Sequence, residues 1–185
     1  MENKLEKNLE TAVFGGGCFW CLEATFKMFR GVESVMPGYA GGEKVDPTYE
    51  EVSAGGTGHA ETVKIMFDPS IISFETLLEV FFTVHDPTTL NRQGNDVGPQ
   101  YRSIILYIDD NQKEATEKYI QKLEAEKIFS DLIVTELAPF DRFYEAESYH
   151  HDYYAKNQAA AYCQAIINPK VSKAREHFKK YLKNS

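Results

Sequence analysis

Two cysteines lie three positions apart in the run GGGCFWC, which spans residues 15–21. They are Cys18 and Cys21, and the third cysteine of the chain, Cys163, lies near its C-terminal end. Three cysteines are an odd number and too few for a disulfide framework in a chain of 185 residues, so we expect free thiols. Glycines beside a thiol let the backbone turn sharply and leave the sulfur accessible, unlike an ordinary buried cysteine. The spacing therefore indicates a thiol that reacts.

The residues that follow the glycines predict a helix over 18–29, with Cys18 in its first turn. Unpaired N–H groups and the helix dipole favour an anion at this end, so we expect the pKa of Cys18 to lie below that of a free cysteine. Trp20 falls on the polar face of the helix, where it is expected to form the wall of a small apolar pocket beside the sulfur. The apolar face consists of Phe19, Leu22, Phe26 and Phe29.

Glu61 is a carboxylic residue on the apolar face of a predicted strand, 61–67. This strand alternates, and its apolar face also carries Val63, Ile65 and Phe67. Burial raises the pKa of a carboxyl group because the charged form loses its hydration. A glutamic acid that stays neutral near pH 7 can act as a general acid. A nucleophilic thiolate beside such a proton donor suits a reduction in which an oxygen atom leaves in protonated form.

Hydrophobic periodicity places the core elements in the order β-α-β-β-α-β, followed by helices. This order predicts an α+β fold, in the broad α/β class: a two-layer, ferredoxin-like split βαβ sandwich with a mostly antiparallel sheet, helices on one side and extra C-terminal helices. Ser73 and Asn111 are expected N-caps, and Pro169 suits a first helical turn. The expected strands are 10–16, one within 32–42, 61–67, 102–109 and 131–137. The expected helices are 18–29, 73–85, 111–127, 143–156 and 169–182, and long functional loops are expected at 40–60 and 86–100.

The composition is that of an ordinary globular protein, with a net charge of −8. This charge argues against nucleic acids and anionic membranes as partners. No run approaches the roughly 18 apolar residues of a membrane span, and the first ten residues lack the apolar stretch of a secretory signal. We expect one cytoplasmic catalytic domain over residues 1–185, monomeric because no obligate interface is indicated, with a disordered extension at about 1–9 and a C-terminal tail at about 157–185.

Five motifs in order resemble the methionine sulfoxide reductase A family: GCFWC, GYAGG (38–42), GTGHAE (56–61), NDVGPQYRS (95–103) and AESYHHDYYAKN (146–157). The resemblance covers about residues 10 to 180. It implies reduction of the S epimer of methionine sulfoxide, free or in oxidised proteins, without a metal or a bound organic cofactor. Any one of these motifs alone would be a weak signal.

The same resemblance assigns roles to individual residues. Cys18 matches the nucleophile, and Glu61 the acid that protonates the sulfoxide oxygen. His150 matches the histidine of the family's YHQ stretch, although His151 stands here in place of the glutamine, and the sequence alone favours a solvated helix face for both histidines. The remaining matches are Tyr49 and Tyr101 as hydrogen-bond donors to the oxygen, Asp96 near the backbone-side groups of the substrate, and Phe19 and Trp20 around its S-methyl group.

Recycling requires a second thiol. Attack on the sulfoxide leaves Cys18 as a sulfenic acid, which condenses with a thiol to a disulfide that thioredoxin or another dithiol then reduces. Cys163, in AAYCQ, matches the family's usual resolving cysteine, with Ala161 in place of its glycine. Cys21, where many members have glycine, lies one helical turn from Cys18. We favour Cys163 as the first resolving cysteine and Cys21 as a second acceptor.

Three other functions fit parts of the pattern. A thioredoxin-like thiol-disulfide oxidoreductase also carries C-x-x-C at a helix start, but it gives Glu61 no role. A structural zinc module could use the three cysteines and His59, although zinc sites usually have two close ligand pairs and only one exists here. A module that binds oxidised peptides without turnover remains a third alternative.

Overall fold

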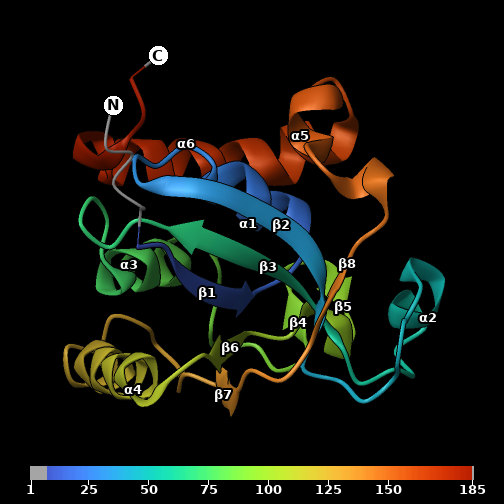
Figure 1. The fold of residues 1–185 in the computed structure, drawn as a ribbon, viewed down its shortest axis with the longest axis horizontal. Helices are drawn as coiled ribbons and strands as arrows, with labels where there is room; N and C mark the ends of the chain where they lie inside the picture. The colour runs from blue at the N-terminus through green and yellow to red at the C-terminus, as the bar shows by residue number, and fades with distance from the viewer. Residues whose placement is uncertain (1–7, 185) are drawn as a thin grey trace, which may run out of the picture.

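The computed structural model describes residues 8–184, so most of the extension expected at 1–9 lies outside the described residues. Within that range the chain forms a six-stranded sheet (Figure 1). A separate two-stranded hairpin pairs β4 with β5. The order across the main sheet is β7 (Glu136–Pro139), β6 (Ile104–Tyr107), β1 (Glu10–Gly15), β3 (Ala60–Phe67), β2 (Val32–Ala40) and β8 (Phe143–Glu145).

The sheet is mostly antiparallel and is covered by helices. This confirms the predicted α/β class and the predicted antiparallel character of the sheet. It is nevertheless mixed, because β7 runs parallel to β6 at one edge. β8 extends the other edge by pairing with β2. Both edge strands lie beyond the four strands of the predicted core.

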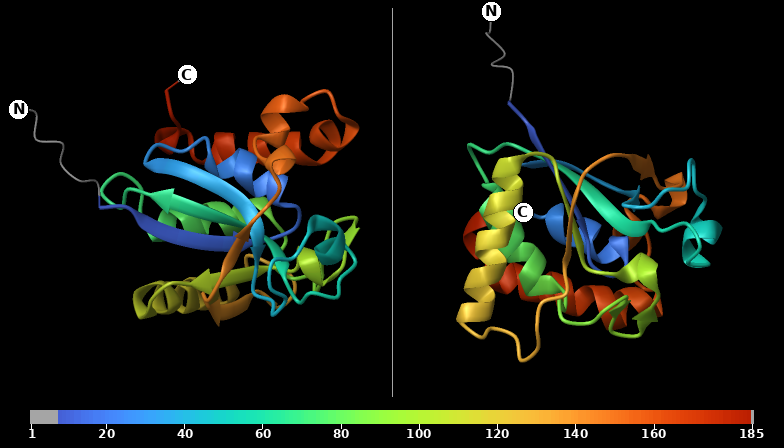
Figure 2. Two further views of the ribbon diagram at one scale, coloured as in Figure 1. Left: turned by 45° about the vertical axis from the view of Figure 1, so that its right-hand side comes forward. Right: turned by 90° about the horizontal axis from the view of Figure 1, so that it is seen from below.

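Three helices pack together against one face of the sheet: α1 (Phe19–Phe26), α3 (Phe74–Val84) and α6 (Asn168–His177) (Figures 1 and 2). A fourth helix, α4 (Asp110–Ala125), lies against α3 and β6. None of the helices between residues 8 and 184 combines the length and the apolar character that crossing a bilayer requires.

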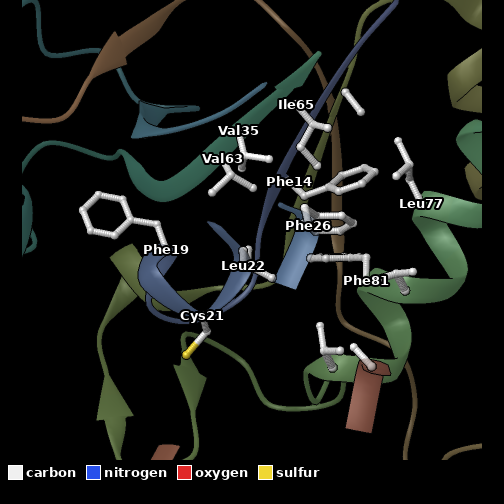
Figure 3. Close-up of a cluster of buried hydrophobic side chains, with 14 of the residues drawn as sticks. Phe14, Phe19, Cys21, Leu22, Phe26, Val35, Val63, Ile65, Leu77 and Phe81 are labelled. Carbon is white, nitrogen blue, oxygen red and sulfur yellow. The ribbon is translucent and has the colours of Figure 1, made fainter. Parts of the chain in front are cut away.

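Phe14 lies at the centre of the core between the sheet and these helices (Figure 3). Its ring centroid lies 5.8 Å from that of Phe26, 5.9 Å from that of Phe74 and 5.0 Å from that of Phe81. The strand therefore joins α1 and α3 through one aromatic cluster. The opposite face of the sheet carries a smaller cluster, made of Val13, Ala40, Ala60, Ile104 and Leu106.

The predicted helix starts are partly confirmed. The Ser73 hydroxyl accepts from the Thr76 amide and caps α3. α4 begins at Asp110 and not at the expected cap Asn111, because the Asp109 carboxylate, on extended backbone, accepts from the amide of Gln112. Pro169 lies in the first turn of α6, as predicted.

The helix predicted over 143–156 is wrong in its first half. Residues 143–145 form β8, a 3-10 turn follows at Ser148–His150, and only α5 (Tyr153–Lys156) is helical. Gly38 makes the pairing of β8 with β2 possible, because a Cβ at that position would lie 2.3 Å from the Phe143 ring and 2.4 Å from the Tyr144 carbonyl oxygen. Tertiary contact thus overrides the helical periodicity.

Four further segments differ from the expectations. The expected strand 131–137 pairs only from Glu136, where its amide donates to the Ser103 carbonyl. The expected loop 40–60 contains α2 (Tyr49–Ser53), and the loop 86–100 contains β4 (Arg92–Gln93) and β5 (Asp96–Val97). The C-terminal tail contains a packed π-helical turn, Cys163–Ile167, that leads directly into α6.

The aromatic cluster predicts the cost of losing its central ring. Phe14→Ala is expected to lower the free energy of unfolding by about 3–5 kcal/mol, because the cavity left among three rings cannot collapse. Denaturant titration measures this change. Leu132→Ala, at a side chain that is 77% exposed, is the control and should change stability little. A loss below about 1 kcal/mol for Phe14→Ala would contradict the central position of this ring.

Candidate active site

Antiparallel pairing of β1 with β3 brings the end of one strand beside the start of the other. Phe14 pairs with Val63, and a Cβ at Gly15 would lie 2.8 Å from the Glu61 carbonyl oxygen. The chain then turns at Gly17, whose φ of +86° suits glycine. Cys18 follows as the N-cap residue of α1. The topology therefore places Cys18 next to the first residues of β3.

The predicted burial of Glu61 is confirmed, since the residue is 2% exposed. One carboxyl oxygen accepts a hydrogen bond of 3.1 Å from the backbone amide of Phe19. Burial raises the pKa of Glu61 to about 8, although the amide bond and the neighbouring Cys18 act in the opposite direction. The carboxyl group is therefore neutral near pH 7, with a proton to donate.

The expected lowering of the Cys18 pKa is wrong. The residue is 7% exposed, and burial, followed by the negative charges of Glu61 and Cys21, raises the pKa of its thiol. Hydrogen bonds from the Trp20 amide and the Tyr162 hydroxyl oppose this shift without cancelling it. Loss of hydration outweighs the helix terminus here, and the two adjacent buried acids resist ionising together.

The sequence places Trp20 on the polar face of α1, which would leave it facing solvent. In the structure the segment after β8 covers the indole. The Tyr153 ring stacks on the indole at 3.6 Å between centroids with an interplanar angle of 7°. The Tyr162 ring meets the indole edge-on at 5.8 Å. The indole N–H donates to Nδ1 of His150 at 3.1 Å. The sequence missed both tyrosines as members of the site, although Tyr153 lies inside one of the quoted motifs.

His150 is 1% exposed, so the solvated helix face expected for it is wrong. Its Nδ1 accepts from Trp20, which assigns the proton of the neutral ring to Nε2. Burial lowers the pKa of His150 and favours this neutral form. The ring lies 5.0 Å from that of Phe19 and 4.5 Å from that of Tyr49. His151 is half-buried and contacts the Ala146 carbonyl oxygen.

Two acidic residues that sequence analysis missed hold this covering segment. Glu147 accepts from the hydroxyl of Tyr39 at 2.7 Å and from the amide of Tyr49 at 2.9 Å. Glu23 of α1 is 1% exposed, and its carboxylate accepts from the amide of Asp152 at 3.0 Å and pairs with Lys27. The segment is thus fixed at both of its flanks to the elements that carry the site.

Tyr49 is the first residue of α2, and Tyr101 is the last residue of a 3-10 turn at Pro99–Tyr101. Burial and the charge of Glu61 raise the pKa values of both phenols, so both hydroxyl groups keep their protons and can donate. The Tyr101 carbonyl accepts from the Gly17 amide at 3.2 Å. Gln100 ties the two segments, since its amide donates to the Ser53 carbonyl.

Asp96 lies in β5 and accepts from the hydroxyl of Tyr162 at 2.8 Å. The same phenol contacts the thiols of Cys18 and Cys21. Burial raises the pKa of Tyr162, with the charges of both thiolates as the next causes. Asp96 is therefore connected to the sulfur site through a tyrosine that precedes Cys163.

The three cysteines are free and buried. The backbone amide of Cys21 donates to the Cys18 carbonyl at 3.1 Å, and burial raises the pKa of its thiol to about 11, with Lys170 acting against the shift. The Cys21 sulfur points away from Leu22 and Phe26 (Figure 3). Cys163 is fully buried in the main core cluster, and burial alone raises its pKa. Cys21 lies one helical turn from Cys18, and its charge acts on the Cys18 thiol.

His59 does not face the cysteines. Its Nδ1 accepts from the Gly42 amide at 3.0 Å, and its Nε2 bonds the Lys44 carbonyl at 2.7 Å. Both ring nitrogens are therefore used to hold the loop before α2, which argues against the zinc module. In the part of the chain that the structure describes, no three side chains of the His, Cys, Asp and Glu types converge as metal ligands.

Comparison with known proteins identifies the family of the chain. The family model described as "Peptide methionine sulfoxide reductase" matches residues 10–182. The protein of this description from Saccharolobus solfataricus is 58% identical over 165 residues, covering 89% of this chain and 92% of that one. The counterpart from Sulfolobus acidocaldarius is 56% identical over 170 residues, covering 92% and 96%.

A solved structure is similar as well. The reduced form of Mxr1 from Saccharomyces cerevisiae has a TM-score of 0.77 and 31% identity, covering 84% of this chain and 89% of that one. The match of the family model over nearly the whole chain, together with these relatives, shows that the chain belongs to the peptide methionine sulfoxide reductase family.

Proposed function

We propose that the protein reduces the S epimer of methionine sulfoxide, in oxidised proteins and as the free amino acid. One observation carries this proposal: a neutral, buried carboxylic acid, Glu61, lies beside the Cys18 thiol at the start of α1. A disulfide oxidoreductase of the thioredoxin type has no use for such a proton donor. Family membership disfavours that alternative independently.

The reaction needs one oxygen transfer and two protons in the right places. The Cys18 sulfur attacks the sulfoxide sulfur while Glu61 gives its proton to the sulfoxide oxygen. The thiol proton of Cys18 returns to the Glu61 carboxylate. The protonated oxygen then passes to Cys18, so that a Cys18 S–O bond forms while the methionine S–O bond and the new S–S bond both break. Methionine leaves, and Cys18 becomes a sulfenic acid, so that one sulfur is oxidised by two electrons and the other reduced by two. The protonated Tyr49 and Tyr101 hydroxyls would stabilise the negative charge that develops on the oxygen.

The aromatic rings would select the substrate. Phe19 and Trp20 offer an apolar seat to the S-methyl group, and His150 holds the indole in place through its N–H. The polar S=O group would point toward Glu61 and the two tyrosines. Together with a third contact, between the backbone-side groups of the substrate and Asp96, this division would discriminate one sulfoxide epimer from the other.

Cys21 is the thiol that we propose as first resolving cysteine, in place of the preference for Cys163 drawn from the sequence. It lies one turn from Cys18, and its negative charge is one of the causes that raise the pKa of the Cys18 thiol. Condensation of the sulfenic acid with the Cys21 thiol forms a disulfide and releases water. Cys163 would act second, because the charge of Cys21 acts on the Cys18 thiol whereas that of Cys163 is not among the causes of the Cys18 shift.

We propose thioredoxin, or another small dithiol, as the reductant that returns both sulfurs to thiols without a bound cofactor. Support comes from the neighbour Mxr1, which has also been solved in complex with Trx2. We further propose a cytoplasmic monomer. Free thiols and a site built from a single chain support this placement.

We also infer that the four central strands have a ferredoxin-like arrangement. Their order, β6-β1-β3-β2, with antiparallel pairing throughout, supports a split βαβ core. The edge strands β7 and β8 would then be additions to that core.

The direct test of the proposed function is turnover of purified S and R methionine sulfoxide with dithiothreitol. Only the S epimer is expected to yield methionine. Equal turnover of both epimers, or of neither, would refute the proposed function.

Glu61→Gln keeps the shape of the side chain and removes the donated proton. Its turnover is expected to fall by about 10²- to 10⁴-fold. Wild-type turnover should decline as pH rises through about 8, because Glu61 then loses its proton, and this decline should be absent from the variant. The pH–rate profile measures both effects, and an unchanged melting temperature at pH 7 shows that the variant folds. A decline near pH 8 that persists in Glu61→Gln would exclude Glu61 as the acid.

The Cys18 thiol is expected to react slowly with iodoacetamide near neutral pH, since burial raises its pKa. The measurement uses a variant in which Cys21 and Cys163 are both serine, so that only Cys18 is alkylated. Its apparent pKa should exceed that of free cysteine in the same buffer. Adding Glu61→Gln should lower this value, because a neighbouring negative charge is removed. An apparent pKa below that of free cysteine, in the variant that keeps Glu61, would contradict the description of Cys18 as a buried thiol.

The order of the thiols can be separated in single turnover. With substrate but without reductant, Cys21→Ser should prolong the sulfenic acid, trapped by dimedone, whereas Cys163→Ser should form the first disulfide at the wild-type rate. Cys163→Ser should instead slow multiple turnover with thioredoxin. Disulfide formation in Cys21→Ser at the wild-type rate would assign the first step to Cys163.

A further inference from the structure

Arg102 lies two residues before β6, and its side chain is only 13% exposed. Its Nε donates to the Glu136 carboxylate at 2.8 Å, and its Nη1 donates to the Pro99 carbonyl at 2.9 Å. Its Nη2 donates to the carbonyl of Gly58 at 3.0 Å and to that of Gly41 at 3.5 Å. One guanidinium therefore holds three backbone carbonyls and a carboxylate that are distant from one another in the sequence.

Two of these carbonyls belong to segments that carry residues of the site. Pro99 is the first residue of the 3-10 turn that ends at Tyr101. Gly58 precedes β3, the strand in which Glu61 is the second residue. The guanidinium of Arg102 is therefore a direct link between the turn that carries the Tyr101 phenol and the loop that leads to the Glu61 carboxyl group.

The strands hold Glu61 and Tyr101 unequally. Glu61 pairs with Tyr39 of β2, and its carboxyl group accepts from the Phe19 amide. Tyr101 lies in a turn of three residues that belongs to no strand of the sheet. Strand pairing thus fixes Glu61, whereas the position of Tyr101 depends on contacts such as those of Arg102.

The loop that Arg102 holds is a firm anchor on its own. The Gly42 amide donates to Nδ1 of His59 at 3.0 Å, and the Glu43 amide donates to the Thr57 carbonyl at 3.3 Å. A Cβ at Gly42 would lie 2.2 Å from the His59 amide nitrogen, so the two loop strands are in close contact. These bonds do not involve Arg102, whose own bonds extend the anchor to the turn at Pro99.

The chemistry of the side chain fits this task. A planar guanidinium presents five N–H donors in a fixed fork, whereas a lysine has three donors on one nitrogen. Arg102 is not among the causes that shift the pKa of Glu61 or of Tyr101. Its effect on both groups therefore passes through the backbone that it holds.

We propose that Arg102 is a positioning residue for the reductase step, in which Cys18 attacks the sulfoxide and methionine is released. It holds the Tyr101 hydroxyl where that group meets the same oxygen that Glu61 protonates. This inference rests on the proposed function, in which both groups act on that oxygen. A displaced turn weakens the hydrogen bond to the developing charge, while the aromatic seat for the methyl group still binds the substrate.

Single turnover without reductant isolates this step. Methionine formed from the S-sulfoxide is followed over time at several substrate concentrations. Arg102→Gln and Tyr101→Phe are each expected to lower the saturating rate constant by about tenfold or more, because a donor to the oxygen is misplaced or lost. The concentration that gives half the maximal rate should change less than about threefold, because ground-state binding is kept. A selective increase of that concentration, with an unchanged rate constant, would overturn the proposal.

The double variant separates positioning from structural damage. If Arg102 acts through Tyr101, adding Arg102→Gln to Tyr101→Phe should slow the step by less than about twofold further. Rate losses that multiply in full would overturn the proposal, and so would an unchanged rate in Tyr101→Phe alone. The melting temperature at pH 7 shows whether the variants fold. If Arg102→Gln does not fold, Arg102→Lys, which keeps the charge but not the fork, replaces it in the same cycle.

Two control variants test the ion pair and the charge. Glu136→Gln keeps an oxygen that can accept from Nε of Arg102 and removes only the ion pair. Arg142→Gln removes an arginine charge at a side chain that is 66% exposed. Each should change the single-turnover rate by less than about twofold, since exposed ion pairs contribute little. A loss in Glu136→Gln as large as that in Arg102→Gln would assign the effect to the ion pair and overturn the proposal.

The outcomes keep this inference apart from the proposed function. No methionine from the S epimer with the wild type would refute the proposed function itself. Turnover by the wild type, together with fully multiplying losses in the cycle, would overturn the positioning role of Arg102 and leave the proposed function standing.

Discussion

One constraint governs this protein: a carboxyl group and a thiol occupy the same dry space at the joined ends of β1 and β3. The antiparallel register of β1 and β3 fixes the backbone positions of Cys18 and Glu61 relative to each other. Gly15, which has no side chain, allows the two strands to lie close together. Because water is excluded, each group resists ionisation, and the thiol resists it more when Glu61 is charged. The resting site therefore holds its protons. A thiol in this state is less reactive toward oxidants, and in the proposed mechanism it would react when a bound sulfoxide accepts the proton that Glu61 keeps.

The dryness depends on a segment that is distant in sequence. Residues from Glu147 to Tyr162 lie over the first turn of α1, and they are held by pairs such as Trp20 with His150, which are 130 positions apart. Glu23 and Glu147 anchor the segment to α1 and to the start of α2. If this cover were loosened, Cys18 and Glu61 would regain water and their pKa values would return toward ordinary values. The tail is therefore part of the acid-base chemistry as well as the carrier of a thiol.

Local patterns predicted what local physics decides. The alternation of 61–67 predicted that Glu61 faces inward, and the cap at Ser73 followed from its own side chain. The helix expected at 143–156 failed because β8 gains partners on a strand more than 100 residues away. The predicted direction of the Cys18 pKa shift was wrong for a similar reason. The sequence indicates the helix terminus, but it does not indicate which distant segment buries the thiol. Tyr162 and Glu147 act only through long-range contacts, and no periodicity marks them. The roles of the individual site residues come from the motif resemblance and not from local patterns, and they stay predictions.

The single tryptophan of the chain has an optical consequence. Its indole is stacked on a phenol ring, bonded to an imidazole and only half exposed to water. If the covering segment moves away from α1, the stacking, the hydrogen bond and the solvent exposure of the indole all change together. The wavelength and intensity of tryptophan fluorescence would therefore report the opening of the site in the unlabelled protein. Trp20, which we propose as part of the seat for the substrate's methyl group, would thus also serve as a built-in spectroscopic probe of access to the site.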